Sequence, residues 1–275
     1  MKYRCILALG LVCLLLVTAC TPQVIAVPPT EPTQPPAVTL NVFAASSLTA
    51  SFGEIGKAFE TKNPGVTVAF NFAGSQQLAQ QINSAAPADV FASANQAQMD
   101  AAAKGGRIAT DASKPFVKNR LVIIYPKANP AGIQALSDLA KPGLKLVLAD
   151  KSVPVGQYAL NFLDKAAQDA ALGAGYKDAV LKNVVSYEQD VKSVLTKITL
   201  GEGDAGIVYT TDAASAAAGK ISQLAIPDAF NVIAVYPIAT LKDSPHLALA
   251  QDFVAFVLSS NGQAILANYG FISIQ

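Results

Sequence analysis

Residues 39–59, TLNVFAASSLTASFGEIGKAF, contain a strand pattern followed directly by a helix pattern. The first part is a short run rich in β-branched and aromatic residues, which predicts a strand over residues 39–44. The second part places large apolar residues at helical spacing, on one face of a predicted helix: Leu48, Phe52, Ile55 and Phe59. A strand, a short turn containing Ser47 and a helix therefore follow one another, as in the unit from which α/β proteins are built.

The same alternation continues to the end of the chain. Further strands are predicted over residues 66–72, 89–92, 121–125, 145–149, 205–209 and 232–239. A second clear helical face consists of Val191, Val194, Leu195 and Ile198, and two more helices are predicted over residues 248–258 and 264–269. The sequence thus predicts an α/β fold with a mostly parallel sheet.

Four of the predicted helices begin shortly after the carboxyl end of a strand. Ser47 and Ser75 open two of them, Pro154 marks the start of a third, and Asp190 is a good N-cap for the fourth. Ligands of open α/β sheets bind at this edge, and each helix N-terminus offers unpaired N–H groups and partial positive charge to an anion. For any one of them taken alone, an ordinary helix cap is the simpler interpretation, because nearly every helix has a Ser or Asp cap.

The amino terminus has the pattern of an export signal. Lys2 and Arg4 precede an apolar run over residues 6–17 that ends in LVTAC at Cys20, which predicts a signal peptide over residues 1–19. The LVTAC ending resembles the lipobox of bacterial lipoproteins, which implies that Cys20 is lipidated, whereas an ordinary secretory signal would leave this cysteine without a role. Residues 20–38 then form a proline-rich segment. We expect this segment to be an extended tether between the lipid at Cys20 and the folded part of the chain.

Composition and motifs argue against several other functions. Lys and Arg number 20 against 19 Asp and Glu, so the chain lacks the charge of a basic nucleic-acid binder. The single histidine, His246, has no G-x-S-x-G nucleophile motif beside it, and no thiols remain after export for a zinc site. The G-x-G-x-x-G string over residues 201–206 follows a helix and precedes a strand, the reverse of the dinucleotide-binding order, so we expect a helix end and turn there. Asp89 could act as a base, although an aspartate at a strand end more often holds neighbouring loops.

Several motifs together resemble the molybdate-binding proteins of ABC importers. They are VFAASSLT at 42–49, FAGS at 72–75, APADVF at 86–91, NRLV at 119–122, VPVGQYA at 153–159, Asp190-Val191, GIVY at 206–209 and YGF at 269–271. The likeness covers residues 40–275 with the motifs in the family's order. It implies a periplasmic-binding-protein type II fold, with a mixed, mostly parallel sheet in each of two lobes and a hinged cleft between them. The lobes would be residues 39–120 plus 233–275, and residues 121–232.

The resemblance also assigns roles to five residues. Ser47 and Ser75 match serines that bind the oxyanion with hydroxyl and backbone N–H, and Tyr209 matches a tyrosine that donates its hydroxyl. Val155 and Val191 match positions that donate only a backbone N–H. Gln76-Gln77 departs from the family's usual Ser or Gly after the second serine, which leaves the shape of that loop open.

The function expected from this resemblance is that of an exported, lipid-anchored, monomeric binding protein for molybdate, and also for tungstate. It would deliver the oxyanion to a membrane permease driven by an ATPase, contact the membrane only through its lipid, and bind no nucleic acid. No catalytic residue and no cofactor are expected, and molybdenum enters only as bound molybdate. The alternatives are a binding protein for sulfate, phosphate or another small anion, and an extracytoplasmic enzyme.

Overall fold

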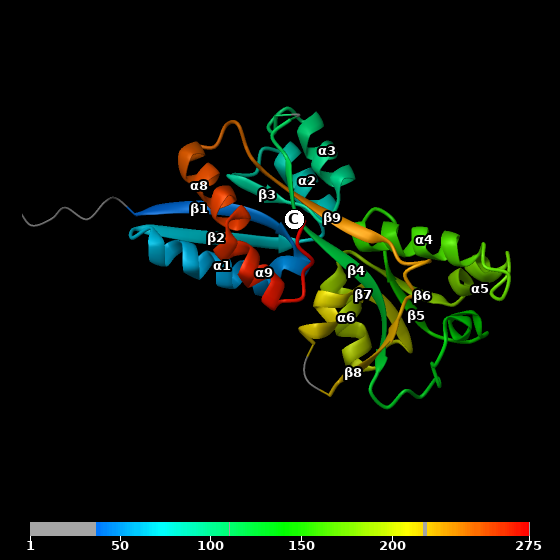
Figure 1. Cartoon of the computed structure of the whole chain (residues 1–275). Helices are drawn as coiled ribbons and strands as arrows, with labels where there is room; N and C mark the ends of the chain where they lie inside the picture. Colours follow the sequence, from blue (N-terminus) through cyan, green and yellow to red (C-terminus); the bar gives the residue numbers. More distant parts are fainter. Residues whose placement is uncertain (1–36, 110, 217–218, 275) are drawn as a thin grey trace, which may run out of the picture. The chain divides into compact units, whose positions relative to one another are not determined.

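The computed structural model describes residues 37–109, 111–216 and 219–274 (Figure 1). The predictions for the signal peptide, Cys20 and most of the proline-rich segment fall outside these residues. The described residues all belong to one compact unit. Within the described part of the chain, no helix combines the length and apolar character needed to cross a membrane. Below, the first lobe denotes residues 39–120 with 233–275, and the second lobe denotes residues 121–232.

The first lobe is built on parallel strands with one antiparallel neighbour. Strand β1 pairs in parallel with both β2 and β3, and β9 pairs antiparallel with β3. Their bounds are β1 (Val38–Ala45), β2 (Val66–Ala73), β3 (Val90–Ala92) and β9 (Ile233–Thr240). The carboxyl ends of the three parallel strands therefore lie at one edge of this sheet.

The second lobe repeats this plan. Strand β5 pairs in parallel with β6 and β7, and β8 pairs only with β4, among the described strands. The bounds are β5 (Leu146–Ala149), β6 (Val184–Glu188), β7 (Ala205–Tyr209) and β8 (Ile221–Ala225). Both lobes thus have a mixed sheet with a parallel centre.

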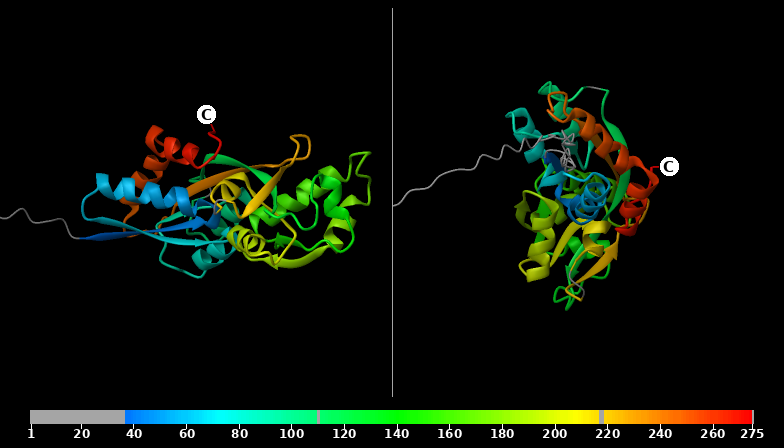
Figure 2. Two further views of the ribbon diagram at one scale, coloured as in Figure 1. Left: turned by 90° about the horizontal axis from the view of Figure 1, so that it is seen from below. Right: turned by 90° about the vertical axis from the view of Figure 1, so that its left-hand side faces the viewer.

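Strand β4 (Lys114–Pro126) belongs to both sheets. Its residues 114–120 pair antiparallel with β9, and its residues 121–126 pair antiparallel with β7 and β8. Figures 1 and 2 show β4 and β9 running together between the two lobes. These two strands therefore connect the two lobes.

Helices cover the sheets of both lobes (Figure 2). Those of the first lobe are the 3-10 turn η1 (Ser46–Leu48), α1 (Thr49–Lys62), α2 (Ser75–Asn83), α3 (Gln96–Lys104), α8 (Leu247–Leu258) and α9 (Ser260–Asn268). Those of the second are η2 (Leu136–Ala140), α4 (Pro154–Ala166), α5 (Tyr176–Lys182), α6 (Val191–Leu200) and α7 (Thr210–Ala214). The helices predicted after residues 47, 74, 153 and 190 are all present at those places.

The predicted apolar helix faces form the core. All four apolar residues of the predicted first helix are buried, Leu48 in η1 and the other three in α1. Phe52 packs against Phe70, Phe116 and Phe253 at ring distances of 5.8–6.2 Å. The four predicted for α6 are buried as well. Burial of such side chains supplies most of the stability of helices of this length, so the pattern in the sequence translates directly into packing.

Some elements were not predicted from the sequence. They are strands β6 and β8, helices α3, α5 and α7, the 3-10 helix η2, and the first seven residues of β4. Strand β6 ends the sheet and exposes Val185 and Tyr187, so it lacks the burial that makes a strand pattern recognisable. The early part of β4 contains Lys118, Asn119 and Arg120. Its pairing with β9 is non-local, since Arg120 pairs with Ile233, 113 residues later in the sequence.

Candidate functional site

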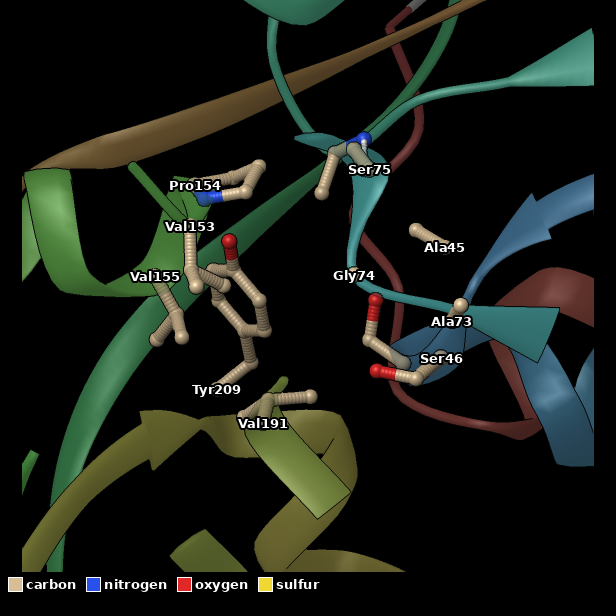
Figure 3. A pocket seen from close by; sticks show the side chains of 12 residues that line it. Ala45, Ser46, Ala73, Gly74, Ser75, Val153, Pro154, Val155, Val191 and Tyr209 are labelled. Atoms are coloured by element: carbon tan, nitrogen blue, oxygen red, sulfur yellow. Dashed lines mark hydrogen bonds between the residues drawn. The ribbon is translucent and has the colours of Figure 1, made fainter. Parts of the chain in front are cut away.

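A small pocket lies at the carboxyl ends of strands from both lobes (Figure 3). The space between atoms at the pocket is about 200 Å³, which includes the part open to solvent. Its lining consists of Ala45, Ser46, Ser47, Ala73, Gly74, Ser75 and Ala94 from the first lobe, and Val153, Pro154, Val155, Val191 and Tyr209 from the second. All five residues predicted to bind the oxyanion are among them. In Figure 3 the labelled residues of the two lobes face each other across the pocket.

Three of the four helix N-termini at this pocket have no side-chain cap. The residues before η1, α2 and α4 are Ala45, Gly74 and Val153, and none of them accepts a hydrogen bond from the first turn through its side chain. The first N–H groups of a helix have no partner within it, so uncapped ends leave donors available. Ser47 and Ser75 lie inside the first turns rather than at capping positions. Their hydroxyls are therefore not used to cap their own helices.

The two serine hydroxyls are held by partners from elsewhere in the chain. Ser75 Oγ accepts a hydrogen bond from the Ala94 N–H at 3.0 Å, and Ser47 Oγ lies 3.0 Å from the Tyr236 hydroxyl. Both serines are more than 90% buried. A hydroxyl that accepts one bond keeps its own hydrogen to donate, so Ser75 is oriented and still has a free donor.

Val155 and Val191 present backbone rather than side-chain chemistry. Pro154 occupies the first position of α4 and has no N–H, so the first donor of that helix belongs to Val155. In α6 the Asp190 carboxylate accepts the N–H groups of Lys192 and Ser193, which confirms the predicted cap. That cap leaves the Val191 N–H as the remaining donor of the first turn.

Tyr209 ends strand β7 and is 1% exposed. Within the described residues its hydroxyl makes no hydrogen bond of normal geometry, although it is buried. Burial, together with the neighbouring Tyr236 and Tyr158, raises the pKa of Tyr209 well above its ordinary value. A buried hydroxyl without a partner costs free energy, and a ligand acceptor in the pocket would remove that cost.

The lining carries no formal charge. Among the described residues no group of His, Cys, Asp and Glu has the arrangement of a metal site. Close in sequence to the lining residues Val191 and Tyr209, Lys192 lies 2.8 Å from buried Asp212, in α7. Burial raises the pKa of Asp212, and Lys192 opposes that rise. The pocket therefore offers dipoles and hydroxyl donors rather than ions.

Comparison with known proteins places this arrangement in a family. The model of the bacterial extracellular solute-binding proteins matches residues 40–272. The chain belongs to this family. It is 42% identical over 268 residues to the molybdate-binding protein ModA of Mycobacterium tuberculosis, covering 96% of this chain and 97% of that protein. It is 31% identical over 238 residues to ModA of Escherichia coli, covering 84% and 88%.

Solved structures of solute-binding proteins share the fold. The periplasmic molybdate-binding protein of Azotobacter vinelandii superposes with a TM-score of 0.72 at 19% identity, covering 86% of this chain and 100% of that one. The sulfate-binding protein SubI of M. tuberculosis gives 0.78 at 17% identity, covering 86% and 88%. The type II periplasmic-binding-protein fold predicted from the sequence is thereby confirmed. The family is one of solute-binding proteins and not of enzymes.

Two residues of this solute-binding protein that support the site were missed in the sequence. Tyr236 on β9 contacts Ser47 through its hydroxyl, and Asn119 on β4 donates to Thr211 Oγ1 at 2.9 Å and accepts from Thr210 Oγ1 at 3.1 Å. Asn119 also approaches the Tyr236 hydroxyl at 3.5 Å. The strands that join the lobes thus hold Ser47 on one side and the segment after Tyr209 on the other. Asn119 is the first residue of the NRLV motif that the chain shares with molybdate-binding proteins, although the motif alone assigns it no role. Nothing in the sequence around Tyr236 indicates a role at the site.

The other candidates from the sequence lie outside the pocket lining. His246 precedes α8 as the expected helix start. Asp89 is buried, accepts the Asn41 N–H at 2.7 Å and the Ser244 hydroxyl at 2.6 Å, and so holds neighbouring segments. Gly201 ends α6 with a φ of 77°, as expected for a helix end and turn. None of these residues is available for the chemistry of the pocket.

Proposed function

We propose that this solute-binding protein captures molybdate, and also tungstate, and delivers it to an ABC permease and its ATPase. The observation that carries the proposal is the meeting of Ser47, Ser75, Val155, Val191 and Tyr209 in one small pocket. These residues come from both lobes and supply hydroxyl or backbone N–H donors. The 42% identity to a protein named for molybdate binding supports the choice of ligand.

The donor lining suits a fully deprotonated oxyanion. Uncapped helix N-termini and hydroxyls donate hydrogen bonds to charged oxygens, which are stronger than bonds between neutral groups. The cavity volume of the pocket is about 10 Å³, which leaves no room for a drug-sized organic molecule. The size and chemistry of the pocket together favour a small inorganic anion.

The two lobes would close on the anion by bending at β4 and β9. Both strands run between the lobes, and they are the segments in which a change of angle would alter the distance across the pocket. Closing would bring the Ser47 and Ser75 side of the pocket against the Val155, Val191 and Tyr209 side. In this proposal the protein acts as a monomer, because one chain supplies both sides.

Molybdate should bind far better than phosphate, and its affinity should stay flat between about pH 6 and 8.5. Hydrogen phosphate carries a proton that needs a good acceptor, and no carboxylate or imidazole lines the pocket. Tyr209, whose pKa lies well above 10, remains a donor throughout this pH range. Calorimetric titrations of molybdate with and without phosphate, at several pH values, test both statements. Strong competition by phosphate, or a steep slope near neutrality, would contradict the donor-only site.

Sulfate is the second candidate, because a sulfate-binding protein of Synechococcus elongatus is 25% identical over 260 residues. Sulfate is also fully deprotonated near neutrality, so the donor lining by itself does not discriminate against it. A thermal-shift screen with molybdate, tungstate, sulfate and phosphate separates the candidates. A larger stabilisation by sulfate than by molybdate would reassign the ligand within the same site.

Anchoring to the membrane through Cys20 forms a separate part of the proposal. The basic residues, apolar run and LVTAC ending at the amino terminus support it, and Cys20 lies outside the described residues. We expect the protein to partition with membranes and detergent, and Cys20→Ala to release it or stall its processing. A wild-type protein that is cleaved and then found wholly in the aqueous fraction would exclude the lipid anchor.

A further inference from the structure

Three amide side chains of the first lobe donate hydrogen bonds to the second lobe. Gln76 Nε2 donates to the Gln189 carbonyl at 2.8 Å. Asn95 Nδ2 donates to Gln157 Oε1 at 3.0 Å, and Gln98 Nε2 donates to the Ser152 carbonyl at 3.0 Å. We call these three bonds the amide clasp.

The members of the amide clasp border the pocket without lining it. On the first lobe, Gln76 follows Ser75 and Asn95 follows Ala94, and both Ser75 and Ala94 line the pocket. On the second lobe, Ser152 and Gln157 flank the pocket residues of α4, and Gln189 lies just before the α6 cap. The clasp therefore surrounds the site with uncharged contacts, which neither repel nor compete for a bound dianion.

We propose that the amide clasp holds the two lobes closed and sets the rate at which the bound oxyanion leaves. The inference rests on the proposed function. Each bond joins atoms of different lobes, so it is lost when the lobes separate. The clasp should thus act on dissociation, which requires opening, and hardly on the encounter between the open protein and the anion.

The geometry of the clasp also favours reopening. Gln76 is 6% exposed, and its Oε1 has no hydrogen-bond partner among the described residues. Closure therefore forms one bond at Gln76 while it buries an unpaired acceptor, and the two effects oppose each other. Asn95 is different, because its Oδ1 accepts the Gln98 N–H and caps α3 while its Nδ2 reaches Gln157. Both of its polar atoms therefore have protein partners in the closed arrangement, unlike those of Gln76.

Gln157→Ala and Gln98→Ala test the clasp without touching the pocket lining. Each removes one bond between the lobes and leaves the Asn95 side chain and its cap of α3 in place. We expect the molybdate dissociation rate to rise about 2- to 10-fold in each variant, with little change in the association rate. The rates are measured by stopped flow on tyrosine fluorescence, which is usable because the chain has no tryptophan.

Gln96→Ala is the matched control. Gln96 lies on α3 like Gln98, but its Nε2 donates within the first lobe, to Asp100 Oδ1 at 2.7 Å. Its removal should leave the dissociation rate unchanged. Melting temperatures of the ligand-free variants show whether each protein is folded. A dissociation rate that rises equally in Gln96→Ala would mean that the effect is not specific to bonds between the lobes, and would overturn the proposal.

A second measurement does not depend on the ligand. Small-angle X-ray scattering of the ligand-free double variant Gln98→Ala/Gln157→Ala should give a larger radius of gyration than the wild type. The variant lacks two of the hydrogen bonds that stabilise the closed arrangement of the lobes. If the wild type binds no molybdate, the proposed ligand is wrong and the scattering decides the clasp alone. If the wild type binds molybdate, unchanged dissociation rates together with identical scattering reject the clasp and leave the proposed function standing.

Discussion

Ser47→Ala and Ser75→Ala are each expected to weaken molybdate binding by about 10- to 150-fold. Each change removes a hydroxyl donor to a charged acceptor, a bond of about 1.5–3 kcal/mol. Isothermal titration calorimetry measures the loss. Val155→Ala and Val191→Ala should change the affinity little, because the donor at both positions is the main chain. Valine variants that bind more weakly than the serine variants would refute the assignment of these residues.

Ser47→Ala is the cleaner of the two serine tests. In Ser75→Ala the Ala94 N–H loses its partner in a buried place, so the ligand-free protein should also lose stability. The Tyr236 hydroxyl, by contrast, still has Asn119 nearby when the Ser47 hydroxyl is absent. Ser51→Ala serves as the matched control, since Ser51 is a buried serine of α1 whose hydroxyl bonds to the Leu48 carbonyl. A loss of affinity in Ser51→Ala would show that general damage to α1, and not a missing ligand donor, explains the Ser47 result.

Gly74→Ala should weaken binding by about 5- to 150-fold, with little effect on the folding of the first lobe. The backbone of Gly74, at φ −60° and ψ 136°, is one that alanine adopts readily. A Cβ at this position would lie 2.4 Å from the Gln189 carbonyl of the second lobe and about as close to the Gln76 amide. Such overlap costs roughly 1–3 kcal/mol, and opening the lobes relieves it, so the strain falls on the closed, ligand-bound state.

Gly53→Ala is the control for this prediction. Gly53 lies in α1, and a Cβ there would meet nothing within 4 Å. Alanine in place of glycine inside a helix should stabilise the protein slightly and leave the affinity unchanged. Calorimetry on both variants, with ligand-free melting curves beside it, gives the comparison. Wild-type affinity in Gly74→Ala would mean that the lobes do not approach each other here when the anion is bound.

The fold class follows from the sequence alone, and so do the helix starts at the edge of the sheets where the pocket lies. Strong periodicity at Leu48, Phe52 and Ile55, and at Val191 and Val194, identified helices whose apolar faces are buried. These signals are local, because a helix face is decided by residues three and four apart. The prediction that helices start just after strand ends likewise depends on neighbouring residues in the sequence. The predicted N-terminal donors at Val155 and Val191 rested on this local information together with the resemblance.

How these helices and strands meet is visible only in the folded chain. The hydroxyl of Tyr236 reaches Ser47, 189 residues away in the sequence, and Gln76 reaches the carbonyl of Gln189, 113 residues away. The first half of β4 is a strand because β9 pairs with it, although its own residues alternate too weakly to predict one. Contacts of this kind depend on the relative placement of distant segments, which the packing of the whole chain sets. A sequence pattern records which face a residue turns to the core, but not which partner it meets there.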